Sequence, residues 1–170
     1  STAYDSGLAF AGAVGCGIIR DPMSPSAAEL FSEDPIVVAE LLKGYTPVDG
    51  FGFVFTDCLG QERFVNRTVD SRALRELYLY PLIRSGMSAA ALRLDGGYLN
   101  GERVCDSREV YRLLVDRIPP DAMVMTQYGD VPSAENMFGN GLYILGAPQS
   151  FKRDVLRDIA WGAVNESDVD

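Results

Sequence analysis

Any chemistry in this chain has to come from carboxylates, tyrosines, arginines, hydroxyls or thiols, because its 170 residues include no histidine. Histidine is the side chain whose unperturbed pKa lies closest to neutral pH, and it is the commonest general base. Its absence excludes serine or cysteine nucleophiles activated by histidine, histidine-ligated zinc or haem, and a histidine phosphorelay. The activities left open are those that the remaining side chains can support.

Acidic residues gather at one predicted turn. Asp57 and Glu62 flank Leu59-Gly60, and Cys58 stands beside Asp57. Carboxylate oxygens suit Mg²⁺, and ferredoxin-like nucleotidyl transferases place acids at such strand ends, so Asp57 and Glu62 are candidate metal ligands for nucleotide chemistry. Acids are also ordinary turn residues, and the spacing matches no calcium loop. Cys58 has no histidine to activate it and is expected to be a passive thiol.

The three cysteines, Cys16, Cys58 and Cys105, lie far apart in the sequence and form no paired spacing. An odd count without a pairing pattern indicates no disulfide framework and favours a reducing intracellular compartment. Three scattered thiols without imidazole cannot close a tetrahedral metal site. We therefore expect no tightly bound transition metal and no cofactor.

Two glycine-rich segments invite comparison with cofactor-binding motifs. Gly12 to Gly17 reads G-x-x-G-x-G, the reverse of the dinucleotide fingerprint, and indicates instead a buried strand that packs closely. Met137 to Ile144 reads M-F-G-N-G-L-Y-I and resembles the M-F-G-K-G-I-Y-F strand of poly-ADP-ribose-polymerase-like transferases. The resemblance implies that Tyr143 stacks on the nicotinamide of NAD. The family's His-Gly pair has no counterpart here, and Glu166 is the only downstream glutamate.

Apolar residues crowd one predicted helix turn. Tyr78, Leu79 and Tyr80 surround most of that turn, which is more than a single buried stripe requires. Trp161 lies at the end of the last predicted helix, before a polar tail. We predict that these four residues form an interface, and that the chain is a non-enzymatic subunit of a larger protein assembly or a protein-binding module. A histidine-free enzyme, acting on nucleotides at Asp57 and Glu62 or on NAD at Tyr143, is the alternative.

The charge balance narrows the choice of partners. With 24 acidic and 15 basic residues the formal net charge is −9, which argues against nucleic acid and favours other protein subunits. The apolar run from Gly7 to Ile19 is shorter than the roughly 20 residues that span a bilayer, so we expect no membrane insertion.

Start and stop signals predict four helices. Asp34-Pro35 begins one that ends at Gly44, and Asp70 or Ser71 begins another that runs toward Gly86 and is split at Pro81. Asp106 with Glu109 suggests a third helix, and Ser150 begins a fourth that ends at Gly162.

Apolar runs predict the strands between these helices. A buried strand lies within Gly7 to Arg20, a β-hairpin covers Phe51 to Val65, and four further strands lie at 89–94, 98–105, 123–125 and 142–145. The predicted core holds Phe53, Phe55, Val65, Leu74, Leu92, Leu114, Val124, Ile144 and Ile159.

The order of the elements predicts an α+β fold. An antiparallel sheet with helices mainly on one face fits this order, as do two ferredoxin-like βαββαβ units in tandem. The halves would be residues 1–96 and 97–170, packed together or forming one domain.

Overall fold

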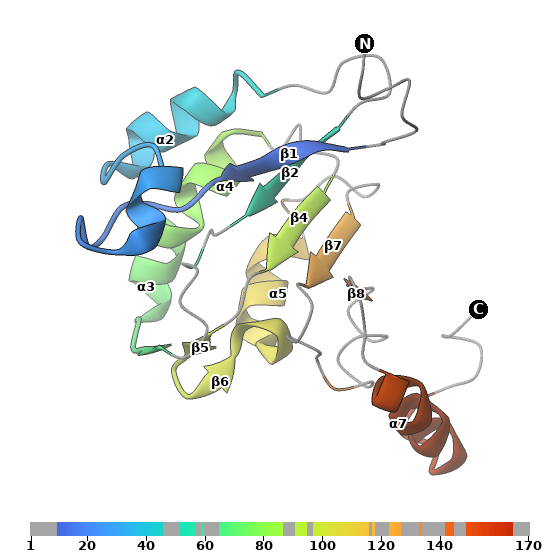
Figure 1. Ribbon diagram of the computed structural model, residues 1–170. Coiled ribbons are helices and arrows are strands. Elements are labelled where there is room, and N and C mark those ends of the chain that lie inside the picture. Colours follow the sequence, from blue (N-terminus) through green and yellow to red (C-terminus); the bar gives the residue numbers. More distant parts are fainter. Residues whose placement is uncertain are drawn as a thin grey trace.

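The computed structural model describes residues 10–45, 52–56, 59, 65–86, 91–94, 97–115, 117, 123–126, 133, 142–144 and 149–164. Its centre is a parallel sheet of five strands (Figure 1), namely β1 (Phe10–Gly15), β2 (Gly52–Thr56), β4 (Ala91–Leu94), β7 (Met123–Thr126) and β8 (Leu142–Ile144). The strands lie side by side in the order in which the chain visits them, and every neighbouring pair is parallel.

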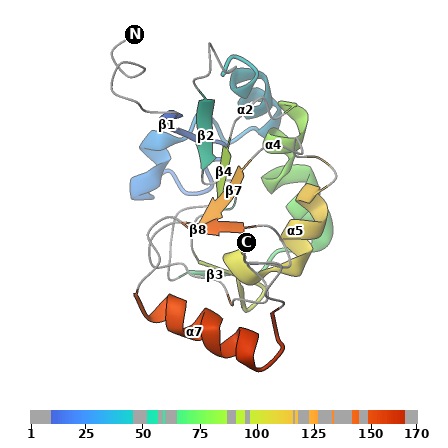
Figure 2. The ribbon, with the colours of Figure 1, turned by 90° about the vertical axis from the view of Figure 1, so that its right-hand side faces the viewer.

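Helices lie between these strands and after the last of them. They are η1 (Pro25–Glu29), α2 (Pro35–Leu42), α3 (Ser71–Ala73), the π-helical η2 (Leu74–Tyr78), α4 (Tyr80–Arg84), η3 (Val104–Asp106), α5 (Arg108–Val115) and α7 (Gln149–Ala160). Figure 2 shows α2, α4 and α5 on the same side of the sheet. A parallel sheet wound in chain order with its crossover helices on one face has the winding of a β/α barrel, because a doubly wound sheet carries helices on both faces.

A second, small sheet has three strands, β3 (Asn66–Arg67), β5 (Tyr98–Leu99) and β6 (Glu102–Arg103). β3 pairs with β5 in parallel, and β5 and β6 form a hairpin. The hairpin turn is Asn100-Gly101, whose φ angles of 54° and 85° suit the type I′ turn that this dipeptide favours. Both ribbon views place this sheet beyond the carboxyl ends of β4 and β7 (Figures 1 and 2).

The structure confirms most of the helix starts and ends that the sequence predicts. The Asp34 carboxylate accepts the Ile36 N–H at 2.8 Å, with Pro35 in the first turn of α2. The Asp70 carboxylate accepts the N–H groups of Arg72 and Ala73, each at 2.9 Å. The Ala73 bond is the main cause of a lowered Asp70 pKa. These bonds satisfy backbone donors that a helix start otherwise leaves open.

The other helix signals have mixed outcomes. Pro81 lies in the first turn of α4 and separates it from the π-helical turn, as predicted. Gly86 and Gly162 have φ angles of 78° and 75°, which suit helix ends. Ser150 lies inside α7 rather than before it, and α5 begins after Ser107 rather than Asp106.

The main core lies between the five-stranded sheet and the helices. Phe55, Leu74, Leu92 and Leu114 are buried there as predicted, and Val124 packs against them. Val65 is exposed, which contradicts the prediction, because the chain has left the main sheet before it. Ile159 packs in a smaller cluster against Val155 of α7 and Val164, which follows this helix. The side chains of Phe53 and Ile144 lie outside the described residues.

The predicted antiparallel, ferredoxin-like α+β fold is wrong. β2 pairs in parallel with β1 and β4, so the Phe51–Val65 hairpin is not formed, and the chain after β2 leads to β3 in the other sheet. The predicted boundary between residues 96 and 97 falls between β4 and β7, which pair in one sheet. Alternating apolar residues cannot reveal the direction of a neighbouring strand, because side chains alternate in both kinds of sheet.

Gly15, at the end of β1, is a place where only glycine fits. A Cβ atom there would lie 2.6 Å from the Glu29 carbonyl oxygen and 2.8 Å from Leu30 Cδ2. The carbonyl is backbone, so β1 or η1 would have to move. We expect Gly15→Ala to lower the free energy of unfolding by about 1–3 kcal/mol, measured by urea denaturation. The control is Gly44→Ala, since its added Cβ meets one atom, at 3.3 Å. An equal loss in both variants would contradict this account.

Candidate functional site at the carboxyl edge of the sheet

The carboxyl ends of four described strands meet at one edge of the main sheet. β1 ends at Gly15, β2 at Thr56, β4 at Leu94 and β7 at Thr126, and all four run in the same direction. In β/α barrels and open α/β sheets, ligands bind at this edge, because the loops that follow the strands converge there. The carboxyl edge is therefore the candidate functional site.

A buried thiol fixes the first part of this edge. The Cys16 N–H donates to the Thr56 carbonyl at 2.7 Å, and its Sγ lies 3.0 Å from the same oxygen. Both residues are buried. These bonds hold the chain after β1 to the last residue of β2, so Cys16 has a structural role in positioning the edge.

Arg93 lies among apolar residues near the end of β4. Leu92 and Leu94 on either side of it belong to the core beneath the helices, so alternation places Arg93 on the opposite face of the sheet. It is half-buried and pairs in register with Met125 of β7. Arg93 was not predicted as a site residue, although the single charge inside the apolar segment Ala-Leu-Arg-Leu is visible in the sequence.

Thr126, the last residue of β7, is fully buried, and no partner for its hydroxyl is found among the described residues. Burying a hydroxyl without a hydrogen bond is costly, so such groups call for water or a ligand. Thr126 is therefore a second polar group at the edge with hydrogen-bonding capacity.

The candidate metal and cofactor residues fall mostly outside the described residues. The residues that are not described include Asp57, Cys58 and Glu62. In the sequence, Asp57 directly follows Thr56, the last residue of β2. Tyr143 lies in β8, where its backbone pairs with Met125. Within the part of the chain that the structure describes, no group of three or more acidic or thiol side chains could hold a metal ion.

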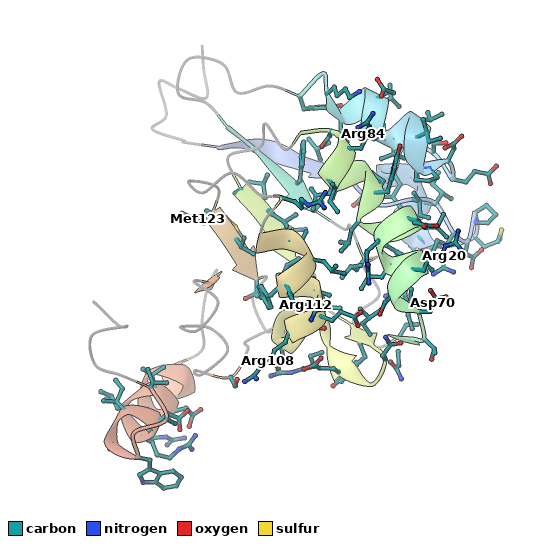
Figure 3. The ribbon with its side chains drawn as sticks, turned by 180° about the vertical axis from the view of Figure 1, so that it is seen from behind. Arg20, Asp70, Arg84, Arg108, Arg112 and Met123 are labelled. Atoms are coloured by element: carbon teal, nitrogen blue, oxygen red, sulfur yellow. The ribbon has the colours of Figure 1, made fainter. Side chains whose placement is uncertain are left out.

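The predicted interface residues have different environments. Tyr78 and Leu79 are buried in the chain's own core, so they do not form an exposed surface. The π-helical turn directs both inward, and the Arg20 guanidinium lies over the Tyr78 ring, 4.7 Å from its centre. Figure 3 shows Arg20 beside this helical segment, near Asp70. Tyr80 is half-buried.

Trp161 is 78% exposed, and the Arg157 guanidinium lies 5.6 Å from the centre of its ring. That a partner covers Trp161 stays a prediction. Among the helices that are described, none is long and apolar enough to cross a membrane.

A polar cluster borders the small sheet. Arg103 Nη2 pairs with Asp106 Oδ2 at 2.5 Å, and Asp106 Oδ1 accepts the Ser133 N–H at 2.9 Å. Burial on its own would lower the pKa of the Arg103 guanidinium. The electrostatic interactions with Cys105 and Asp106 raise this pKa by more, so the net shift is upward. Burial raises the pKa of Tyr111, whose hydroxyl donates to the Cys105 carbonyl at 3.3 Å. Arg103 therefore stays charged and is held in place.

Several solved β-glucosidases share the fold of this chain. β-Glucosidase 3B from Thermotoga neapolitana matches 98% of this chain with a TM-score of 0.83 and 17% identity, and the match covers 26% of that protein. The GH3 β-glucosidase of Bifidobacterium adolescentis matches 99% with a TM-score of 0.77 and 17% identity, over 27% of its length. DesR, a β-glucosidase from Streptomyces venezuelae solved with D-glucose, matches 94% with a TM-score of 0.75 and 23% identity, over 23% of its length.

No protein-family model and no curated protein sequence matches the chain. The prediction of a non-enzymatic, ferredoxin-like structural subunit is contradicted, because the solved structures that match this chain are parallel-sheet β-glucosidases. The match also contradicts the alternative predictions of nucleotide or NAD chemistry. At this level of identity the comparison shows the fold: the chain folds like about a quarter of a β-glucosidase of this kind.

Proposed function

We propose that this chain is a glycosidase-type domain that binds β-glucosides at the carboxyl edge of its sheet and cleaves them with carboxylates. The observation that carries the proposal is the five-stranded parallel sheet in chain order, superimposable on β-glucosidase 3B with a TM-score of 0.83. The chain spans about a quarter of that protein, so the proposal concerns the part of a site that these strands carry.

The absence of histidine is consistent with this chemistry. Most glycosidases use two Asp or Glu residues, one as general acid and the other as nucleophile or base, and need neither imidazole nor metal. The chain holds 24 acidic residues and no histidine. Of the reaction classes that the composition leaves open, glycoside hydrolysis is one that carboxylates alone can perform.

Two carboxylates have suitable positions in the sequence. Asp57 directly follows Thr56 at the end of β2, and Asp95 directly follows Leu94 at the end of β4. β2 and β4 are neighbours in the sheet, so both residues follow strands that end at the carboxyl edge. Most glycosidases cleave with two carboxyl groups. Asp57 and Asp95 are therefore our candidates for the catalytic pair, with Arg93 as a donor to sugar hydroxyls.

The proposal is tested by incubating the chain with 4-nitrophenyl β-D-glucoside and, separately, with its α-anomer. We expect release of nitrophenol from the β-anomer alone, and binding of glucose in a calorimetric titration. A chain that neither binds glucose nor cleaves the β-glucoside would overturn the proposal. Equal cleavage of both anomers would overturn the specificity that it assigns.

A further inference from the structure

The outer face of α7 carries large apolar side chains beside arginines. Trp161, which follows the helix, and Leu156 are both more than half exposed. Arg153 and Arg157 are exposed on the same face, because residues four apart on a helix lie one above the other. Arg157 also pairs with two aspartates on the flank of the helix. Tryptophan and arginine often carry the binding energy of protein interfaces. We call Arg153, Leu156, Arg157 and Trp161 the α7 face.

α2 is apolar on both of its sides. Its inner side, with Val38 and Leu42, is buried, and the helix packs against α4. On the outer side Ile36, Val37 and Leu41 are 57%, 44% and 47% exposed. A helix at the surface of a globular protein normally turns polar residues outward, and adjoining exposed apolar groups mark an interaction surface. We call Ile36, Val37, Glu40 and Leu41 the α2 face.

The two faces complement each other in charge as well as in hydrophobicity. Glu33 and Glu40 are exposed beside the apolar groups of α2, and Glu40 pairs with Lys43. The α7 face carries Arg153 and Arg157, in a chain whose net charge is −9. Within the described part of the chain, neither Glu33 nor Arg153 has an ion-pair partner. Since opposite charges across an interface favour the correct partner, a second copy of this chain offers each face the chemistry that fits it.

The two faces lie too far apart to meet within one copy. Both ribbon views place α2 at one end of the molecule and α7 at the other (Figures 1 and 2). We infer that the α7 face of one copy binds the α2 face of a second copy, with the apolar groups packed together and the arginines beside the glutamates. A contact between two different faces leaves one face free on each copy, so copies join head to tail. This inference does not depend on the proposed function.

The experiment measures the mass of the chain in solution by light scattering, from micromolar to millimolar concentration. The α7 variant carries Leu156→Ser and Trp161→Ser, and the α2 variant carries Ile36→Ser and Leu41→Ser. The mass of the parent should rise with concentration beyond that of a dimer, and each variant should associate about tenfold more weakly. A mixture of the two variants should form a 1:1 dimer and nothing larger, because one intact face of each kind remains. Leu77→Ser is the matched control, since Leu77 is an exposed apolar residue on neither face, and should behave like the parent.

The mixing step makes the inference falsifiable. Self-association of the α2 variant as strong as that of the parent would show an α7–α7 contact, and the same result for the α7 variant would show an α2–α2 contact. Either result would overturn the head-to-tail arrangement, as would a mixture that forms no dimer. A parent that keeps the mass of one chain throughout would show that another partner covers these faces. Single variants, Trp161→Ala and Ile36→Ala, replace any double variant whose circular dichroism departs from that of the parent.

Discussion

Replacing Asp57 or Asp95 by asparagine is expected to lower the rate of β-glucoside hydrolysis by about 10²–10⁴-fold. Asparagine keeps the size of the side chain but cannot accept or donate a proton in catalysis or attack the anomeric carbon. Binding of glucose should change little, because the amide still forms hydrogen bonds. The measurement is kcat with 4-nitrophenyl β-D-glucoside, together with glucose affinity for each variant.

The matched control for these variants is Asp34→Asn. Asp34 is an exposed carboxylate that accepts the Ile36 N–H at the start of α2, and asparagine is an equally good helix cap. Hydrolysis by this variant should equal that of the parent. If Asp57→Asn and Asp95→Asn also retain full activity, these two residues are not the catalytic pair and the assignment fails.

The second large effect is on stability. Phe55 is fully buried in the middle of β2, in a core cluster that includes Leu92, and is among the largest buried side chains described. Phe55→Ala should lower the free energy of unfolding by about 3–5 kcal/mol, through lost apolar contacts and the cavity that remains. Urea denaturation followed by circular dichroism measures this loss.

Val37→Ala serves as the control for Phe55→Ala. Val37 lies on the exposed side of α2, so its truncation should cost less than about 0.5 kcal/mol. A loss below about 1 kcal/mol for Phe55→Ala would contradict the position of the core between sheet and helices.

The helix ends could be predicted from the sequence because their causes are local. The Asp34 and Asp70 carboxylates cap helices by binding N–H groups two or three residues away, and Gly86 ends its helix through its own φ angle. Such bonds depend on a few neighbouring residues, which the sequence shows directly. Pro81 likewise separates two helical segments because it lacks an N–H group.

Strand direction could not be predicted in the same way. β1 and β2 are parallel because the chain between them, which includes η1 and α2, crosses over before the second strand begins. A hairpin was predicted at Phe51–Val65, whereas the hairpin that forms has Asn100-Gly101 as its turn, between β5 and β6. Asn-Gly is a strong local hairpin signal.

The candidate site was harder to predict than the elements. Arg93 and Met125 come together only through the register of β4 and β7, which depends on the whole sheet. Among the sequence-based candidates, Tyr78 and Leu79 belong to the core because a π-helical turn rotates them inward, a feature that no helical periodicity predicts.

The central claim, a sugar site at the carboxyl edge of the sheet, is tested most directly by chemical-shift mapping of the isotope-labelled chain titrated with methyl β-D-glucoside. We expect the backbone signals of Cys16, Thr56, Arg93 and Thr126 to shift in a saturable manner, while those of α7 stay unchanged. The absence of saturable shifts at these four residues, or shifts confined to α7, would contradict the account.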